Sequence, residues 1–239
     1  MKVSRTRYLT LVAIFSAISF GLMFLDFAIP AVIPSFVKMD FSELPALIAS
    51  FALGPSAGVL VCLIKNLIHL SITTTSGVGE LANFLIGAAL VFPAGMIYKY
   101  RHNKLYAIIA CFAGAIIMGL ASYPINLWIT YPFYYNFMPK EVILGMYQAI
   151  LDWVDSIELS LLVFNLPFTM VKGLAVAIIT ILVYKPLSPI IHGYGKFAFK
   201  KKNAVIEEPV EENETPITPE VEDTVKDEVT DANDASQIK

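Results

Sequence analysis

The residues best suited to chemistry are polar side chains that interrupt long apolar stretches. They are Lys65, Asn66, His69, Glu80, Asn83, Asn126, Asn165, Thr169 and Lys172. At helical spacing, residues 165, 169 and 172 share one face, and residues 80 and 83 share another. Amides, carboxylates and ammonium groups that converge in this way are typical of a pocket for a polar or planar small molecule. Hydrogen bonds between helices, with lysines extending to the polar interface, would explain the same residues and remain open.

Aromatic residues are frequent in the same parts of the chain. They include Phe36, Phe41, Phe84, Tyr123, Trp128, Tyr131, Phe133, Tyr134 and Tyr135. Most are typical of an aromatic belt at a membrane interface. Some could stack on a flat ring in a pocket. Gly77 and Gly79 either let the backbone approach a ligand closely or form a turn.

Catalysis has little support in the sequence. There is no GxxxxGK[ST] phosphate-binding loop and no HExxH motif. The three histidines are scattered, and Cys62 and Cys111 lie alone within apolar runs, as buried thiols do. We therefore expect no enzyme activity, no metal site and no resident cofactor.

The composition predicts a membrane protein. Of 239 residues, 56% are hydrophobic and 15% are charged, with a mean hydropathy of +0.66. Soluble domains carry about 25% charged residues. The net charge of −3 hides a segregation, because residues 203–239 hold 12 of the 20 acidic residues and only 2 of the 17 basic ones. We predict that residues 1–202 form one basic membrane domain and that residues 203–239 form a disordered acidic cytoplasmic tail.

A membrane span needs about 20 mostly apolar residues in a helix. The expected fold class is an all-α integral membrane protein with six transmembrane helices, of which the second is short. Pro30 and Gly54-Pro55 separate the first three helices. The helices are expected at about residues 8–29, 44–53, 56–72, 80–98, 105–131 and 158–184, and the connection at 132–157 is expected at the membrane interface.

Basic residues indicate the orientation. They cluster before the first span, at Lys99 to Lys104, and at Lys185 to Lys202. An even number of predicted helices separates each cluster from the next, so all three can lie in the cytoplasm. Both termini are then cytoplasmic, and the protein is expected in the plasma membrane of a prokaryote. In the first helix, the small residues Ala13 and Ala17 suit either internal packing or docking on a separate membrane subunit.

Several short motifs resemble those of the riboflavin-specific S components of energy-coupling factor (ECF) vitamin transporters. They are D-F-S-E-L-P at 40–45, G-P-S-A-G at 54–58, I-K-N-L at 64–67, G-V-G-E-L-A-N-F at 77–84 and P-F-T-M-V-K-G at 167–173. The resemblance covers about residues 5–195. The first and fourth motifs are the most specific to the riboflavin members.

The resemblance implies a substrate-binding subunit that captures riboflavin from outside. Transport would need a transmembrane T component and two ATPases, which fits the missing phosphate-binding loop. Ala13 and Ala17 match the AxxxA motif for docking on the T component. The implied binding residues are Phe36, Met39, Asp40, Glu43, Gly77, Gly79, Glu80, Asn83, Phe84, Asn126, Asn165, Thr169 and Lys172.

One position departs from the family pattern. The sixth helix of the family usually reads P-x-N-x-x-K, and here Thr169 stands at the asparagine position. A hydroxyl lacks the paired donor and acceptor of an amide. Asn165, one turn earlier on the same face, is a candidate to compensate. The main alternatives are an S component for another vitamin and an intramembrane enzyme using Glu80, Lys65 and His69. A self-contained secondary transporter is also open, although no inverted repeat is visible.

Overall fold

The computed structural model describes residues 4–73 and 75–183, and these residues are mostly helical. The predicted acidic tail and the basic cluster at 185–202 lie outside the described residues. The elements are α1 (Arg5–Met23), β1 (Phe27–Ala28), β2 (Lys38–Met39), α2 (Glu43–Leu53), α3 (Pro55–His69), η1 (Leu70–Ile72), α4 (Val78–Tyr100), α5 (Lys104–Ile125), η2 (Asn126–Thr130), α6 (Tyr131–Tyr134), α7 (Lys140–Gln148), α8 (Ile157–Ser160) and η3 (Leu161–Asn165), after which the last helix continues over 166–183.

Within the described residues, five continuous helices are long and apolar enough to cross a membrane. They are Arg5–Met23, Pro55–Ile72, Val78–Tyr100, Lys104–Tyr134 and Ile157–Val183. The remaining helix of the predicted plan is its short second helix, α2, which has only 11 residues. At 1.5 Å per residue it extends about 16 Å, roughly half of the hydrocarbon layer.

The first helix is shorter than predicted. We expected it to reach about Ile29, and α1 ends at Met23. Ile29 precedes Pro30, which disfavours helical geometry at that residue. Phe27 and Ala28 instead pair antiparallel with Met39 and Lys38, so a small hairpin interrupts the predicted all-α fold.

Close packing holds α2 against its neighbours. Gly54, at φ 108°, and Pro55 at the start of α3 reverse the chain between the two helices. A Cβ on Gly95 would lie 2.0 Å from Ser50 Oγ. The Ser50 hydroxyl donates to the Val91 carbonyl at 2.8 Å. The small residue at 95 therefore lets α4 approach α2 closely enough for this bond.

Two helices contain a π-helical turn, η2 in one and η3 in the other. In each turn, a backbone N–H donates to the carbonyl five residues earlier. The Tyr131 N–H donates to the Asn126 carbonyl, and the Leu166 N–H donates to the Leu161 carbonyl. A proline follows each donor directly, Pro132 after Tyr131 and Pro167 after Leu166, and a proline has no N–H to continue the helical hydrogen bonds.

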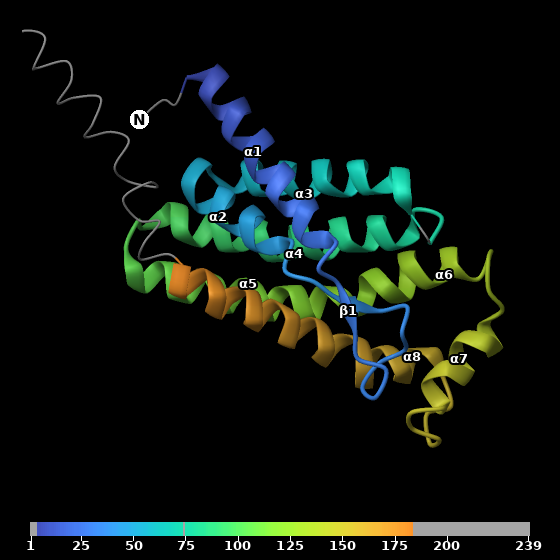
Figure 1. Cartoon of the computed structure of the whole chain (residues 1–239). Helices are drawn as coiled ribbons and strands as arrows, with labels where there is room; N and C mark the ends of the chain where they lie inside the picture. Colours follow the sequence, from blue (N-terminus) through green and yellow to red (C-terminus); the bar gives the residue numbers. More distant parts are fainter. Residues whose placement is uncertain (1–3, 74, 184–239) are drawn as a thin grey trace, which may run out of the picture. The chain divides into compact units, whose positions relative to one another are not determined.

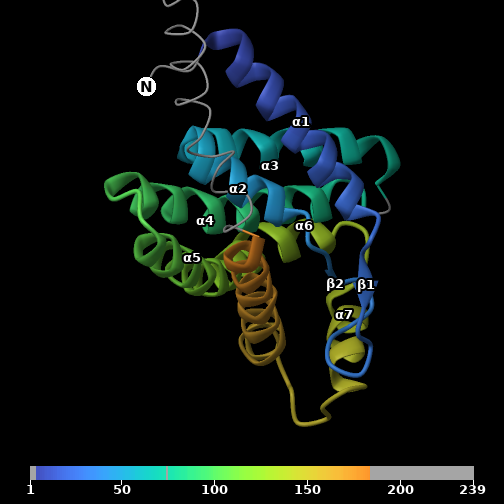
Figure 2. The same cartoon turned by 60° about the vertical axis from the view of Figure 1, so that its left-hand side comes forward.

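The connection predicted at 132–157 contains a helix of its own, α7, which packs inward. Its Ile143 and Tyr147 are buried with Ile33, Met39 and Phe164 in one apolar cluster. Figures 1 and 2 show α7 beside the β1–β2 hairpin, at one end of the bundle. The turns from α2 to α3 and from α4 to α5 lie at the opposite end (Figure 1).

Candidate functional site

A cavity of about 350 Å³ lies between the hairpin segment, α4, η2 and the last helix. This volume falls within the range of ligand pockets in proteins, about 300–1,000 Å³. Its polar lining residues are Asp26, Lys38, Asp40, His69, Thr75, Glu80, Asn83, Asn126, Thr130, Asn165, Thr169 and Lys172. Aromatic and apolar groups complete the wall, among them Phe36, Tyr134 and Phe168.

Most of the predicted binding residues come together at this cavity. Those that line it are Phe36, Asp40, Gly79, Glu80, Asn83, Asn126, Asn165, Thr169 and Lys172. They come from segments far apart in the chain, since residues 36 and 172 belong to the first loop and the last helix. The structure brings them together as the predicted pocket requires. Whether each one contacts a ligand stays a prediction.

Four predicted residues lie outside the cavity lining. Met39 is buried in the cluster with α7, and Phe84 packs against the main core. Gly77 caps the start of α4 with a φ of 86°, a left-handed conformation that favours glycine. Glu43 is fully buried and paired with lysines. Whether these four residues contact a ligand also stays a prediction.

Four buried charges form one network next to the cavity. Lys172 Nζ lies 2.9 Å from Asp40 Oδ2 and 3.3 Å from Glu43 Oε2. Lys65 Nζ lies 3.1 Å from Glu43 Oε1 and also donates to the Ser42 hydroxyl. The network holds two positive and two negative groups, so the buried charges balance. It joins the D-F-S-E-L-P motif to α3 and to the last helix.

Asp40 is the member of this network that lies in the loop before α2. Burial disfavours ionisation of its carboxyl, but the nearby ammonium groups of Lys172 and Lys65 outweigh that effect. The Ser42 N–H donates to Asp40 Oδ1 at 2.8 Å. The pKa of Asp40 is therefore held well below its usual range. At neutral pH this carboxylate anchors the loop to the last helix.

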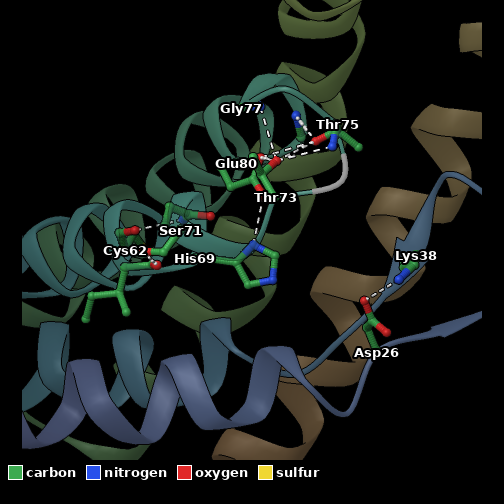
Figure 3. Close-up of polar contacts among 12 residues, drawn as sticks. Asp26, Lys38, Cys62, His69, Ser71, Thr73, Thr75, Gly77 and Glu80 are labelled. Carbon is green, nitrogen blue, oxygen red and sulfur yellow. Dashed lines mark hydrogen bonds and ion pairs between the residues drawn. The ribbon is translucent and has the colours of Figure 1, made fainter.

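A second network organises the segment before α4 (Figure 3). Glu80 accepts hydrogen bonds from Thr73 Oγ1 at 2.8 Å and Thr75 Oγ1 at 3.2 Å. His69 Nδ1 lies 2.8 Å from the other carboxylate oxygen. Thr73 Oγ1 in turn accepts from the Gly77 N–H at 3.2 Å. Glu80 thus holds the G-V-G-E turn in place, and its oxygens are already occupied.

Three polar side chains of the cavity wall remain available. Asn83, Asn126 and Thr169 line the cavity, and their side chains make no hydrogen bond within residues 4–73 and 75–183. Asn126 and Thr169 are 5% and 7% exposed. Buried polar groups are normally satisfied, so unpaired ones that face a cavity are suited to hydrogen-bond a small molecule or water there. These residues are the best candidates for direct contacts.

Several lining residues were not among the individually predicted binding residues. Asp26 and Lys38 form an ion pair of 2.9 Å at the hairpin, and both line the cavity (Figure 3). Thr130 and Tyr134 also line it, from the stretch that includes η2 and α6. The sequence had indicated Tyr134 only as one of several aromatic residues of a membrane belt or a stacking wall. The hairpin itself could not be predicted, because strands of two residues are too short to show an alternation of polar and apolar side chains.

The geometry does not support the enzyme alternative. Lys65 has no solvent exposure and is paired with Glu43, so it is not free to act on a substrate. The motif G-P-S-A-G has the G-x-S-x-G spacing, but that nucleophile motif joins a strand to a helix. Here it joins α2 to α3. In the described part of the chain, no three His, Cys, Asp or Glu side chains form a group that could hold a metal ion.

Comparisons with known proteins identify the family. Residues 7–184 match the model of the family described as ECF transporter, substrate-specific component. The chain belongs to this family. The S component is 30% identical over 188 residues to the riboflavin transporter RibU of Staphylococcus aureus, covering 79% of this chain and 94% of that protein. It is 29% identical to the riboflavin transporter FmnP of Bacillus subtilis, covering 77% and 94%.

A solved structure agrees with these relatives. It is described as the S component of a bacterial ECF transporter, and it superposes with a TM-score of 0.62 at 30% identity. The match covers 79% of this chain and 99% of that chain. With five apolar helices among its described residues, the S component is a multi-pass protein of a prokaryotic plasma membrane. Ala13 and Ala17, the residues predicted to dock a partner, are both exposed on α1.

Proposed function

We propose that this S component binds riboflavin from outside the cell and delivers it inward as part of an ECF importer. The observation that carries the proposal is the cavity with three unpaired polar groups, in a chain about 30% identical to riboflavin transporters. Riboflavin combines a flat ring, hydrogen-bonding edges and a hydroxylated chain. Phe36, Phe168 and Tyr134 could contact the ring, and Asn83, Asn126 and Thr169 could bond its polar edges.

In the membrane, five helices would cross fully and the short α2 would cross in part, with both termini in the cytoplasm. Arg101 and Lys104 lie at the turn between α4 and α5, at the end of the bundle opposite the hairpin (Figure 1). Basic residues favour the cytoplasmic side, which places the cavity end outside. The short α2 crosses the inner half, and the hairpin segment occupies the outer half above it. This arrangement would admit riboflavin from the external medium.

Delivery would require a T component and two ATPases. The full sequence has no phosphate-binding loop, so ATP would have to be hydrolysed by other subunits. The exposed Ala13 and Ala17 offer a small-residue face on which another membrane helix could pack closely. The S component would then contribute recognition, and its partners would supply the energy.

The test is a riboflavin titration of the protein in mild detergent, in which binding is measured as quenching of flavin fluorescence. We expect saturable quenching with one flavin per chain. Asn126→Ala should weaken binding by about 1–3 kcal/mol, the cost of an unmet buried partner. Asn136→Ala is the matched control, because Asn136 is exposed and bonds only nearby carbonyls.

A folded protein that ignores riboflavin would overturn the substrate assignment. Thiamine, biotin and folate would then be tested in the same assay, since the family membership would still stand. Equal affinity of the wild type and Asn126→Ala would overturn the role of Asn126 alone.

A further inference from the structure

Three side chains beside the cavity form a closed ring of hydrogen bonds. Tyr147 Oη lies 2.6 Å from Asn165 Oδ1, and Asn165 Nδ2 lies 3.2 Å from Tyr131 Oη. The two tyrosine hydroxyls bond each other and close the ring. Tyr131 is 1% exposed, Tyr147 0% and Asn165 4%. The ring joins α6, α7 and the π turn η3, so its geometry depends on all three.

The direction of the hydrogen bonds around the ring follows from the chemistry. An amide oxygen can only accept, so Tyr147 must donate its single proton to Asn165 Oδ1. Tyr131 must then donate to Tyr147, and Asn165 donates to Tyr131. The reverse orientation of the amide would require an N–H donor at 2.6 Å and an O–H donor at 3.2 Å, each at an unfavourable distance. Burial also raises the pKa of Tyr147 above its usual value, which keeps the hydroxyl protonated.

One donor is left over from this ring. Asn165 has two N–H groups, and the ring uses one of them. Asn165 and Tyr131 line the cavity, whereas Tyr147 does not. We propose that Tyr147 is a positioning residue for substrate recognition, because it fixes the Asn165 amide so that its free N–H meets an acceptor atom of the ligand. This inference rests on the proposed function.

Tyr147 acts on recognition without lining the cavity. The terminal torsion of asparagine is broad, so an amide without a partner for its oxygen can rotate. Tyr147 removes that freedom before the ligand arrives, and a preorganised contact costs less on binding. Phe36, a cavity residue, packs edge-on against the Tyr147 ring with centroids 6.3 Å apart. The same tyrosine therefore supports two parts of the wall.

The test is a double-mutant cycle on riboflavin affinity, with Tyr147→Phe, Asn165→Ala and the two combined. Tyr147→Phe removes one oxygen and keeps the ring packing. We expect it to weaken riboflavin binding about three- to tenfold, as the net value of one hydrogen bond predicts. In the Asn165→Ala background the same change should have no further effect, because Tyr147 acts through Asn165. Tyr123→Phe is the control, since Tyr123 is half-buried and does not line the cavity.

The outcomes separate this inference from the proposed function. If the wild type does not bind riboflavin, the proposed function fails and the positioning role falls with it. If the wild type binds and Tyr147→Phe binds equally well, only the positioning role is overturned. An equal loss in both backgrounds would also overturn it, because that result indicates a general structural effect. If Tyr147→Phe does not fold, the Asn165→Leu variant provides the test. A riboflavin affinity of Asn165→Leu equal to that of the wild type would contradict the proposal.

Discussion

Replacing Lys172 by methionine tests the balance of the buried charges. The side chain has nearly the same length, so the main change is the loss of one positive charge. Lys172 contacts Asp40 at 2.9 Å and Glu43 at 3.3 Å, and all three side chains are at most 10% exposed. After the change, Lys65 alone would face two carboxylates.

The expected cost follows from these contacts. Breaking a buried ion pair by removing one partner costs about 3–5 kcal/mol, because the other charge is left buried. Asp40 keeps its bond from the Ser42 N–H, and Glu43 keeps Lys65 at 3.1 Å. We therefore expect Lys172→Met to destabilise the protein by about 3 kcal/mol, the lower end of that range. The double variant Asp40→Asn, Lys172→Met restores neutrality and should recover most of the loss.

Thermal unfolding in detergent measures both variants, and riboflavin titration shows whether each still binds. The expected order of stability is wild type, then the double variant, then Lys172→Met. A double variant as unstable as the single one would refute the reasoning, since neutrality would then be irrelevant. So would a single variant with an unchanged melting temperature.

Three further predictions concern other parts of the site. Because ammonium groups outweigh the effect of burial and hold the pKa of Asp40 below its usual range, its ionised form adds stability above about pH 4. That stability is lost as the pH falls through the lowered pKa of Asp40. The melting temperature of Asp40→Asn should therefore fall less on acidification than that of the wild type. Glu80→Gln should weaken riboflavin binding by about 1–2 kcal/mol in a titration, because the carboxylate holds Thr73 and Thr75; unchanged affinity would contradict this. Gly95→Leu should lower the melting temperature sharply, whereas Gly145→Leu should not, because no atom lies within 4 Å of the position that a Cβ at residue 145 would take.

Much of the helical plan could be read from the sequence, because long apolar runs have few alternatives. The positions of the polar residues within those runs also pointed to one site, since a lipid environment makes each of them costly. Asn83, Asn126 and Thr169 illustrate this, as they now line one cavity. The short helix α2 could also be predicted, because it lies between the polar loop and Gly54-Pro55.

The rest depended on contacts between distant segments. Glu43 and Asp40 have similar chemistry and lie three residues apart, yet only Asp40 lines the cavity. The neighbouring sequence does not distinguish Asp40 from Glu43. Their different positions depend on how Lys65 and Lys172 approach from two other helices. Likewise, the hairpin depends on pairing between residues 27–28 and 38–39, and no alternation of two residues can reveal it. The inward packing of α7 was hidden in a segment with several charges.

The π turn at Leu161–Asn165 has a consequence for the length of the chain. Such a turn is one extra residue in an otherwise regular helix, and each residue of a helix turns it by about 100°. Deleting a single residue there would remove the extra residue, and the turn would close as a regular α-helical turn with nearly the same total rotation. Ile157 is fully buried, and after the deletion it would keep its direction relative to Asn165, Thr169 and Lys172. Relatives that carry an alignment gap at this point should therefore retain both the apolar anchor and the cavity face.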